Sequence, residues 1–205
     1  MGLMVVGMAG VASATLINTG TVEYAGAARK LIYDTDLDIT WLDYTKGATI
    51  WDNQVAWAAG LSFTIDGVTY DDWRLPSAGA SPTWGYNVTS SEMGHLFYDE
   101  LGMQSYPDKG GDTTTAELNS SPYFDNLIAS WYWSGTEYAG NSNNAWNFNT
   151  NNGNQNNNNK NNNNYGLAVF SGQVSAAPVP EPATMLLFGT GLAGLAGVSI
   201  RRKKK

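Results

Sequence analysis

Alternating apolar and polar positions predict short strands in the first half of the chain. Segments 31–34 and 39–42 are rich in aliphatic and aromatic residues and flank an acidic turn, which predicts two short strands. Residues 63–70 alternate with a period of two around Asp66-Gly67, a pair that favours a two-residue hairpin turn. We therefore expect β-structure on both sides of residues 51–61, where the period changes.

Two segments follow a helical period instead. In 51–61 one face collects apolar residues at helical spacing, and Gly60 predicts the end of that helix. A second helix is predicted to begin at Thr89, because Thr89 and Glu92 match the Ser/Thr-x-x-Glu pattern of a capping box. The apolar face of this second helix would consist of Met93, Leu96, Phe97 and Leu101.

The second half of the chain predicts further strands separated by polar segments. Residues 102–122 are rich in Gly, Asp, Thr and Pro, which is typical of a loop. Strands are predicted at Trp131–Ser134, Ala145–Phe148 and Tyr165–Phe170. Asparagine dominates 141–164, and from 149 to 164 too little apolar surface remains to be buried, so a mobile loop is expected there. This order of elements favours an α+β fold over an alternating βαβ sheet.

The first residues have the hydropathy of an export signal. Residues 1–11 are apolar and small, and Ala12-Ser13-Ala14 follows with the small-x-small pattern of a signal peptidase site. We therefore predict a signal peptide over residues 1–14.

The last residues form a tripartite pattern. A linker over 175–182 ends in Pro180-Glu181-Pro182 and is followed by an uncharged apolar run and five basic residues, Arg201–Lys205. The apolar run of about 18 residues would reach ~27 Å as a helix, which matches the core of a bilayer. Segment 183–205 therefore predicts a transmembrane helix with a cytoplasmic basic tail, and the rest of the chain lies outside.

This tail resembles the PEP-CTERM sorting signal of Gram-negative bacteria that secrete exopolysaccharide. The resemblance implies that an exosortase-type membrane peptidase recognises Pro180, Glu181 and Pro182. It further implies that the C-terminal helix anchors the exported protein until processing, after which the protein lies at the cell surface or in the extracellular matrix.

Composition excludes several classes of function. Five of the 11 basic residues are the last five of the chain, which leaves six against 18 acidic residues elsewhere. Nucleic acid is therefore not an expected partner, because phosphate contacts need Lys and Arg. The chain has no cysteine, which excludes disulfides, thiolate metal sites and Cys nucleophiles.

Three groups of motifs in the middle of the chain resemble one family. They are Asp36–Leu42, Trp73-Arg74-Leu75-Pro76, and Tyr132-Trp133-Ser134 followed by Ala145–Phe148. Together they resemble the Lcl C-terminal domain, named for a Legionella collagen-like adhesin, over roughly residues 28–170. The resemblance implies that 15–174 form a C-type-lectin-like α+β domain, with two helices packed on irregular antiparallel sheets. The related formylglycine-generating chemistry relies on cysteines, so this chain cannot perform it.

Two aromatic residues are candidates for ligand binding. Trp84 and Tyr86 lie two residues apart in a loop-like segment, where exposed rings could stack on sugar rings. Core packing is expected instead for Trp41, Trp57, Trp73, Trp133 and Trp146, which lie in apolar or alternating contexts.

The acidic turn is a candidate metal site. Asp34, Asp36 and Asp38 alternate and could converge on calcium. An EF-hand is excluded, because its sixth and twelfth positions require Gly and Glu, and Ile39 and Thr45 occupy them here. A looser calcium site and a turn of solvated carboxylates are the two remaining interpretations, and no other cofactor is indicated.

Three further features have structural interpretations. Arg74 is expected to join the helices to the sheet through Asp71 or Asp72, with a sugar- or carboxylate-binding arginine as the alternative. His95, the only histidine, is expected as a half-buried helix residue. The asparagine tract is either a tolerated expansion or a segment that binds polysaccharide or promotes self-association.

The sequence thus favours a non-catalytic, exported protein of the cell surface or exopolysaccharide matrix that binds glycan or another matrix component. Two alternatives differ in class. One is a secreted hydrolase that uses paired carboxylates, and the other is a structural surface domain without a ligand.

Overall fold

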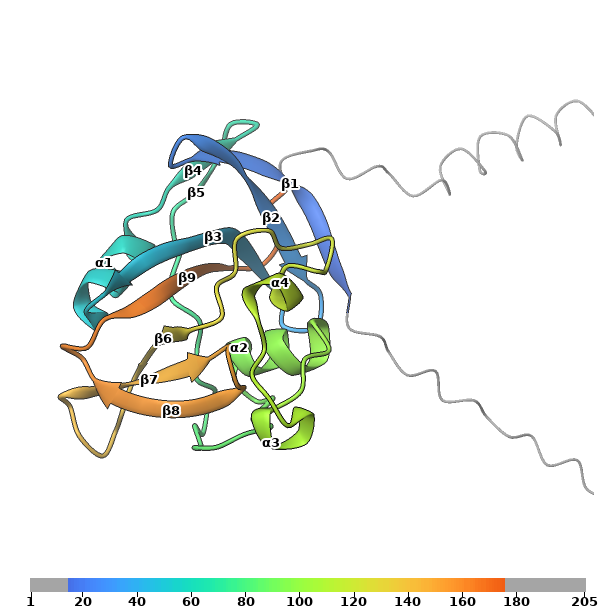
Figure 1. Ribbon diagram of the computed structural model, residues 1–205. Helices are drawn as coiled ribbons and strands as arrows, with labels where there is room; N and C mark the ends of the chain where they lie inside the picture. The colour runs from blue at the N-terminus through green and yellow to red at the C-terminus, as the bar shows by residue number, and fades with distance from the viewer. Residues whose placement is uncertain (1–14, 176–205) are drawn as a thin grey trace, which may run out of the picture.

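The computed structural model describes residues 15–175, which fold around a seven-stranded sheet (Figure 1). The strand order is β1-β2-β3-β9-β6-β7-β8. These strands are β1 (Leu16–Tyr24), β2 (Ala27–Asp34), β3 (Ile39–Thr49), β6 (Trp131–Glu137), β7 (Asn144–Asn149), β8 (Asn154–Asn159) and β9 (Asn164–Ser171). A separate hairpin consists of β4 (Phe63–Ile65) and β5 (Val68–Tyr70).

The last strand, β9, joins the two halves of the sheet. It pairs antiparallel with β3 along most of its length and parallel with β6 at Tyr132 and Tyr165. Arg74 adds a further antiparallel bridge to β9, through two backbone hydrogen bonds of 2.9 Å with Val169. Residues from early, middle and late parts of the chain therefore meet on one strand.

The helices are short. They are α1 (Trp51–Ala59), α2 (Glu92–His95) with the π-helix η1 (Leu96–Glu100) directly after it, α3 (Tyr106–Lys109) and α4 (Thr115–Leu118). The first predicted helix is confirmed, including its end at Gly60. The predicted capping box at Thr89 is wrong, because the Ser91 side chain caps α2 by accepting from the Gly94 N–H.

A capping box does occur in the segment that the composition predicted as loop, 102–122. There the Thr114 side chain accepts from the Glu117 N–H, and the Glu117 side chain accepts from the Thr114 N–H. The loop prediction for 102–122 is therefore wrong where α3 and α4 form.

The middle strands of the sheet are buried on both faces. Consecutive residues on a strand point to opposite faces, and here neighbours such as Leu31 and Ile32, or Tyr132 and Trp133, belong to two different apolar clusters. The cluster that contains Ile32 packs against α2, η1 and α4, whereas the cluster that contains Leu31 packs against α1 and the β4–β5 hairpin. Four of the five tryptophans predicted for the core are buried, namely Trp41, Trp73, Trp133 and Trp146, and Trp57 is partly buried.

The asparagine tract contradicts the prediction of a mobile loop over 149–164. Residues 154–159 form β8, which pairs with β7 along its full length. Gln155 is buried on this strand, and its side-chain amide donates to the carbonyls of Ala78 and Thr83. Backbone pairing and one buried amide therefore order a segment that has almost no apolar side chains.

The architecture is mostly β-sheet with a few short helices, which is compatible with the α+β class. Within residues 15–175, no helix is long and apolar enough to cross a membrane. The predicted signal peptide over 1–14, the Pro-Glu-Pro motif and the predicted membrane helix over 183–205 lie outside the described residues.

The close packing at the start of α2 generates a stability prediction. A Cβ atom on Gly94 would collide with the Val88 carbonyl oxygen and lie 2.8 Å from the Ser91 hydroxyl. We expect Gly94→Ala to lower the free energy of unfolding by about 1–3 kcal/mol, the usual cost of overpacking. Urea denaturation measures this change. Gly47→Ala is the matched control, because a Cβ there meets no atom within 4 Å; equal losses in both variants would contradict the packing argument.

Candidate functional site

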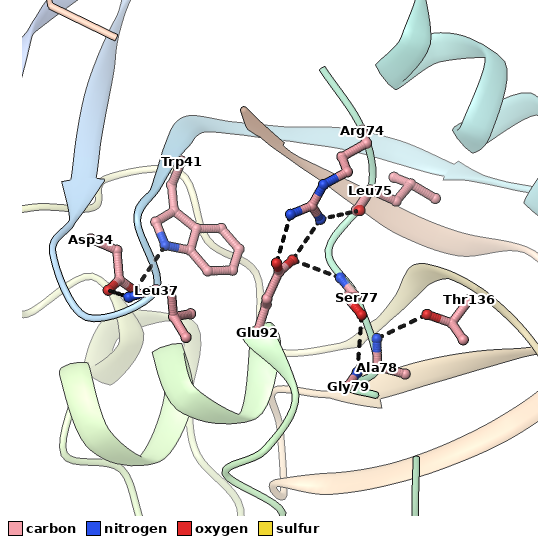
Figure 2. Close-up of polar contacts among 10 residues, drawn as sticks. All are labelled: Asp34, Leu37, Trp41, Arg74, Leu75, Ser77, Ala78, Gly79, Glu92 and Thr136. Carbon is pink, nitrogen blue, oxygen red and sulfur yellow. Dashed lines mark hydrogen bonds and ion pairs between the residues drawn. The ribbon is translucent and has the colours of Figure 1, made fainter. Parts of the chain in front are cut away.

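An arginine–glutamate pair connects the sheet to the second helix. Arg74 donates from both terminal guanidinium nitrogens to the two Glu92 carboxylate oxygens, each at 2.7 Å (Figure 2). Glu92 also accepts from the Ser77 N–H at 2.7 Å. The expected partners, Asp71 and Asp72, are therefore not the carboxylates that pair with Arg74. Glu92 lies 18 residues further along the chain, so local sequence gave no signal for it.

The pair has the geometry of a structural clamp. In bidentate pairing, both terminal nitrogens of the planar guanidinium group bind the two carboxylate oxygens. The backbone of Arg74 is in turn bonded to Val169 on β9. The clamp thus holds the first residue of α2 against the central sheet. A cavity of about 540 Å³ opens beside it, but the two charged groups in its wall are already paired with each other.

The acidic turn does not gather its three aspartates. Asp34 is fully buried, whereas Asp36 and Asp38 are exposed. One Asp34 oxygen accepts from the Leu37 N–H and the other from the Trp41 indole (Figure 2). The first oxygen also accepts from the Asp36 N–H. Asp38 accepts from the Tyr33 hydroxyl. Among the described residues, only Asp34 of these three belongs to a group able to hold a metal ion.

The other members of that group are His95 and Glu100. His95 Nε2 lies 3.8 Å from an Asp34 carboxylate oxygen and 3.4 Å from Glu100 Oε1. On the opposite side of the imidazole ring, Nδ1 lies 3.1 Å from the Asp99 carboxylate. The expectation of a half-buried His95 is confirmed in part, since its side chain is 13% exposed. The sequence signal that was available is the placement of Asp99 and Glu100 four and five residues after the only histidine.

Burial and charge perturb this cluster. Desolvation, together with the nearby Asp34 charge, raises the pKa of Glu100 to about 7, although His95 opposes the rise. Glu100 can therefore hold a proton near neutral pH. Its side chain is only 2% exposed, so neither bulk water nor a large substrate reaches it.

A second candidate site lies on the surface around Trp84. This side chain is 56% exposed, and its ring packs against Tyr138 and Trp146 with centroid distances of 5.6 and 5.5 Å. Tyr138 also contacts Trp146 edge-on at 5.6 Å. The three rings therefore support one another, and only Trp84 is largely open to solvent. Tyr86, the other predicted residue, is 39% exposed.

Amide side chains share the face of these rings. In the β7–β8 pairing, Trp146 lies opposite Asn157, and Asn144 lies opposite Asn159. Directly opposed residues project to the same side of a sheet, so these asparagines lie on the Trp146 face. Asn144 donates to Asn157 at 2.9 Å. We define the aromatic–amide face as Trp84, Tyr138, Trp146, Asn144, Asn157 and Asn159.

The loop that carries Trp84 is fixed to the edge of the sheet. Gly85 and Gln155 exchange two backbone hydrogen bonds of 2.9 and 2.8 Å. The buried Gln155 side chain binds the same loop through the Thr83 carbonyl. Trp84 is thus held in place without being buried. The sequence indicated Trp84 as an exposed aromatic residue, but it did not indicate that Tyr138 packs against it.

Comparison with known proteins identifies the tail. Residues 178–203 match the PEP-CTERM protein-sorting motif, which confirms the motif predicted at Pro180, Glu181 and Pro182. No curated protein and no solved structure matches the chain. The chain therefore carries the signal of an exported protein that exosortase, a membrane protease, sorts. The same motif implies that the C-terminal region anchors the protein in the membrane before processing.

The clamp generates a prediction about stability. We expect Arg74→Lys to lower the free energy of unfolding by about 1–3 kcal/mol, because an ammonium group cannot replace the bidentate pair and Glu92 is only 15% exposed. Thermal or urea denaturation measures the loss. Arg29→Lys serves as the control, since that guanidinium is not paired with a carboxylate in the described residues. A similar loss in both variants would show that bidentate pairing is not the cause.

The sorting motif generates a prediction about processing. We expect Glu181→Ala to leave most of the protein unprocessed in the membrane fraction, because the glutamate is the charged member of the recognised triplet. Immunoblots of cell fractions distinguish the full-length from the shortened chain. Pro178→Ala, outside the triplet, is the matched control and should be processed as the wild type is. Normal processing of the Glu181 variant would contradict the role of the triplet.

Proposed function

We propose that this exported protein is a non-catalytic component of the cell surface or exopolysaccharide matrix that binds glycan through the aromatic–amide face. The observation that carries the proposal is the exposure of Trp84 on a support of Tyr138 and Trp146. An exposed aromatic ring is costly to keep in water. A ring held there by two others has the form of a prepared stacking surface.

The chemistry of the face matches the two sides of a sugar ring. The flat face of Trp84 suits the apolar C–H groups of a pyranose, and the amides of Asn157 and Asn159 can donate to and accept from hydroxyl groups. Because this face lies on strands and on a loop fixed to them, little conformational entropy is lost on binding.

The net negative charge of the chain outside its basic tail limits which glycans it can bind. Outside the basic tail the chain has three times as many acidic as basic residues. Such a surface repels polyanions. The proposal therefore specifies a neutral polysaccharide rather than a uronic acid-rich or sulfated one.

Burial disfavours the alternative of a hydrolase with paired carboxylates. The closely placed carboxylates of Asp34 and Glu100 have side chains that are 0% and 2% exposed, so a polysaccharide chain could not reach them. The other alternative is a surface domain without a ligand, and a binding experiment distinguishes it from the proposed glycan-binding protein.

The experiment uses the full chain and neutral exopolysaccharide from the bacterium that produces the protein. We expect saturable binding in affinity electrophoresis, weakened about tenfold or more by Trp84→Ala, because a stacked aromatic ring contributes on the order of 1 kcal/mol beyond the area it buries. Tyr106→Ala is the control, since Tyr106 is 47% exposed but lies outside the aromatic–amide face. Tyr86→Ala tests whether the second predicted aromatic residue takes part.

Three results would count against this function. Absence of saturable binding would favour the ligand-free structural domain. Equal weakening by the Trp84 and Tyr106 variants would show that binding is not localised to the aromatic–amide face. Loss of binding in chelator, restored by calcium, would point to an ion-dependent site instead of stacking alone, which would reopen the interpretation of the turn over 34–38.

A further inference from the structure

Two buried polar atoms of the cluster below the acidic turn have no hydrogen-bond partner. They are His95 Nε2 and Glu100 Oε1. The atoms are 3.4 Å apart, yet their geometry is not that of a hydrogen bond. The Glu100 side chain is 2% exposed, so water does not satisfy it from the surface. An unsatisfied buried carboxylate oxygen is costly. His95 and Glu100 each have a ligand atom within 4.8 Å of one in the buried Asp34 carboxylate.

The π-helix turn brings these groups together. In an α-helix, residues five apart are separated by about 140° around the axis, so their side chains diverge. Here the Leu101 N–H donates to the Leu96 carbonyl at 2.9 Å, an i→i+5 bond that widens the turn. His95 and Glu100 consequently project to one side. Such π-turns are rare and are frequent at functional sites.

The surroundings orient both the histidine and the aspartate. The Asp99 carboxylate lies 3.1 Å from His95 Nδ1, whereas Asp34 and Glu100 face Nε2, the other nitrogen of the ring. A carboxylate on the far nitrogen is the usual outer partner of a metal-binding histidine. Asp34 is held by two backbone N–H groups and the Trp41 indole, and its oxygens keep further lone pairs.

The spacing of the ligand atoms fits a small ion. Ligands about 2.1 Å from a tetrahedral zinc ion are separated from one another by about 3.4 Å. His95 Nε2 is 3.4 Å from Glu100 and 3.8 Å from Asp34, and one ligand atom of each of the three residues lies within 4.8 Å of the others. Calcium and magnesium prefer oxygen ligands, whereas an imidazole nitrogen with carboxylates suits zinc or manganese.

We propose that Asp34, His95 and Glu100 bind one divalent transition-metal ion, zinc or manganese, between the β2–β3 turn and the α2–η1 helix. The site differs from the turn of Asp34, Asp36 and Asp38 in its ligands and its metal. Since the three side chains are 0%, 13% and 2% exposed, the ion would have a structural role. It would cross-link two segments that are about 60 residues apart in the chain.

The test uses the full chain in detergent, without a histidine tag, after dialysis against a chelator. Zinc, manganese and calcium are titrated separately by calorimetry. We expect one zinc or manganese ion per chain and no saturable calcium binding, with a higher melting temperature in the metal-bound protein. Because the chain has a single histidine, nitrogen NMR reports on it directly. Zinc should shift the Nε2 resonance far more than the Nδ1 resonance.

Variants of matched shape separate ligands from neighbours. His95→Gln and Glu100→Gln should each weaken zinc binding more than tenfold, whereas Asp99→Asn should weaken it about tenfold by disturbing the histidine. Glu23→Gln, an exposed glutamate on β1, is the control and should leave binding unchanged.

Several results would overturn the proposal. They are binding of neither zinc nor manganese, equal affinity in the His95 variant, or an unchanged Nε2 resonance in zinc. The NMR result is obtained on the wild-type chain, so it stands even if a variant does not fold. Binding of calcium alone would overturn the choice of metal and with it the assignment of His95 as a ligand.

Discussion

The insertion of β9 between β3 and β6 is the constraint on which the rest of the structure depends. This strand is buried on both faces, with Leu167 and Val169 in one apolar cluster and Ala168 in the other. It also provides the backbone partner of Arg74, and through Arg74 it fixes the start of α2. Without β9, the backbone hydrogen-bond ladders of the two halves of the sheet would not be joined. The positions of both the Asp34–His95–Glu100 cluster and the aromatic–amide face therefore depend on β9, although β9 contributes no residue to either site.

Sequence periodicity predicted the parts of the fold whose causes are local. The hairpin at Asp66-Gly67 forms because both residues adopt positive φ angles, and α1 ends at Gly60 as its spacing indicated. Predictions failed where distant partners decide the outcome. Glu92 looked like a helix cap but serves Arg74 and Ser77, and β8 forms through pairing with β7 despite its polar composition. The tail was recognisable because a sorting signal is read as a linear pattern.

The two candidate sites were visible in the sequence to different degrees. Trp84 stood out because it lies in a polar loop, but its support from Tyr138 depends on a contact between segments more than 50 residues apart. The sequence indicated Asp34 as a potential metal ligand but grouped it with the wrong residues, because alternation in the turn suggested Asp36 and Asp38 as the other ligands. Its actual neighbours come from a helix whose π-turn no residue pattern announces. Residue types were thus predictable, whereas their grouping required the tertiary structure.

The backbone bridge between Gly85 and Gln155 affects how readily copies of this chain can associate through β8. β8 is the last strand of the sheet, and an edge strand exposes backbone groups on which another copy of the chain can add. An uncharged asparagine-rich strand is especially suited to such stacking. The Gly85 loop occupies this edge at Gln155 with two hydrogen bonds of its own. The segment that presents Trp84 to solvent therefore also hinders strand-by-strand polymerisation, which matters most where many copies are retained side by side.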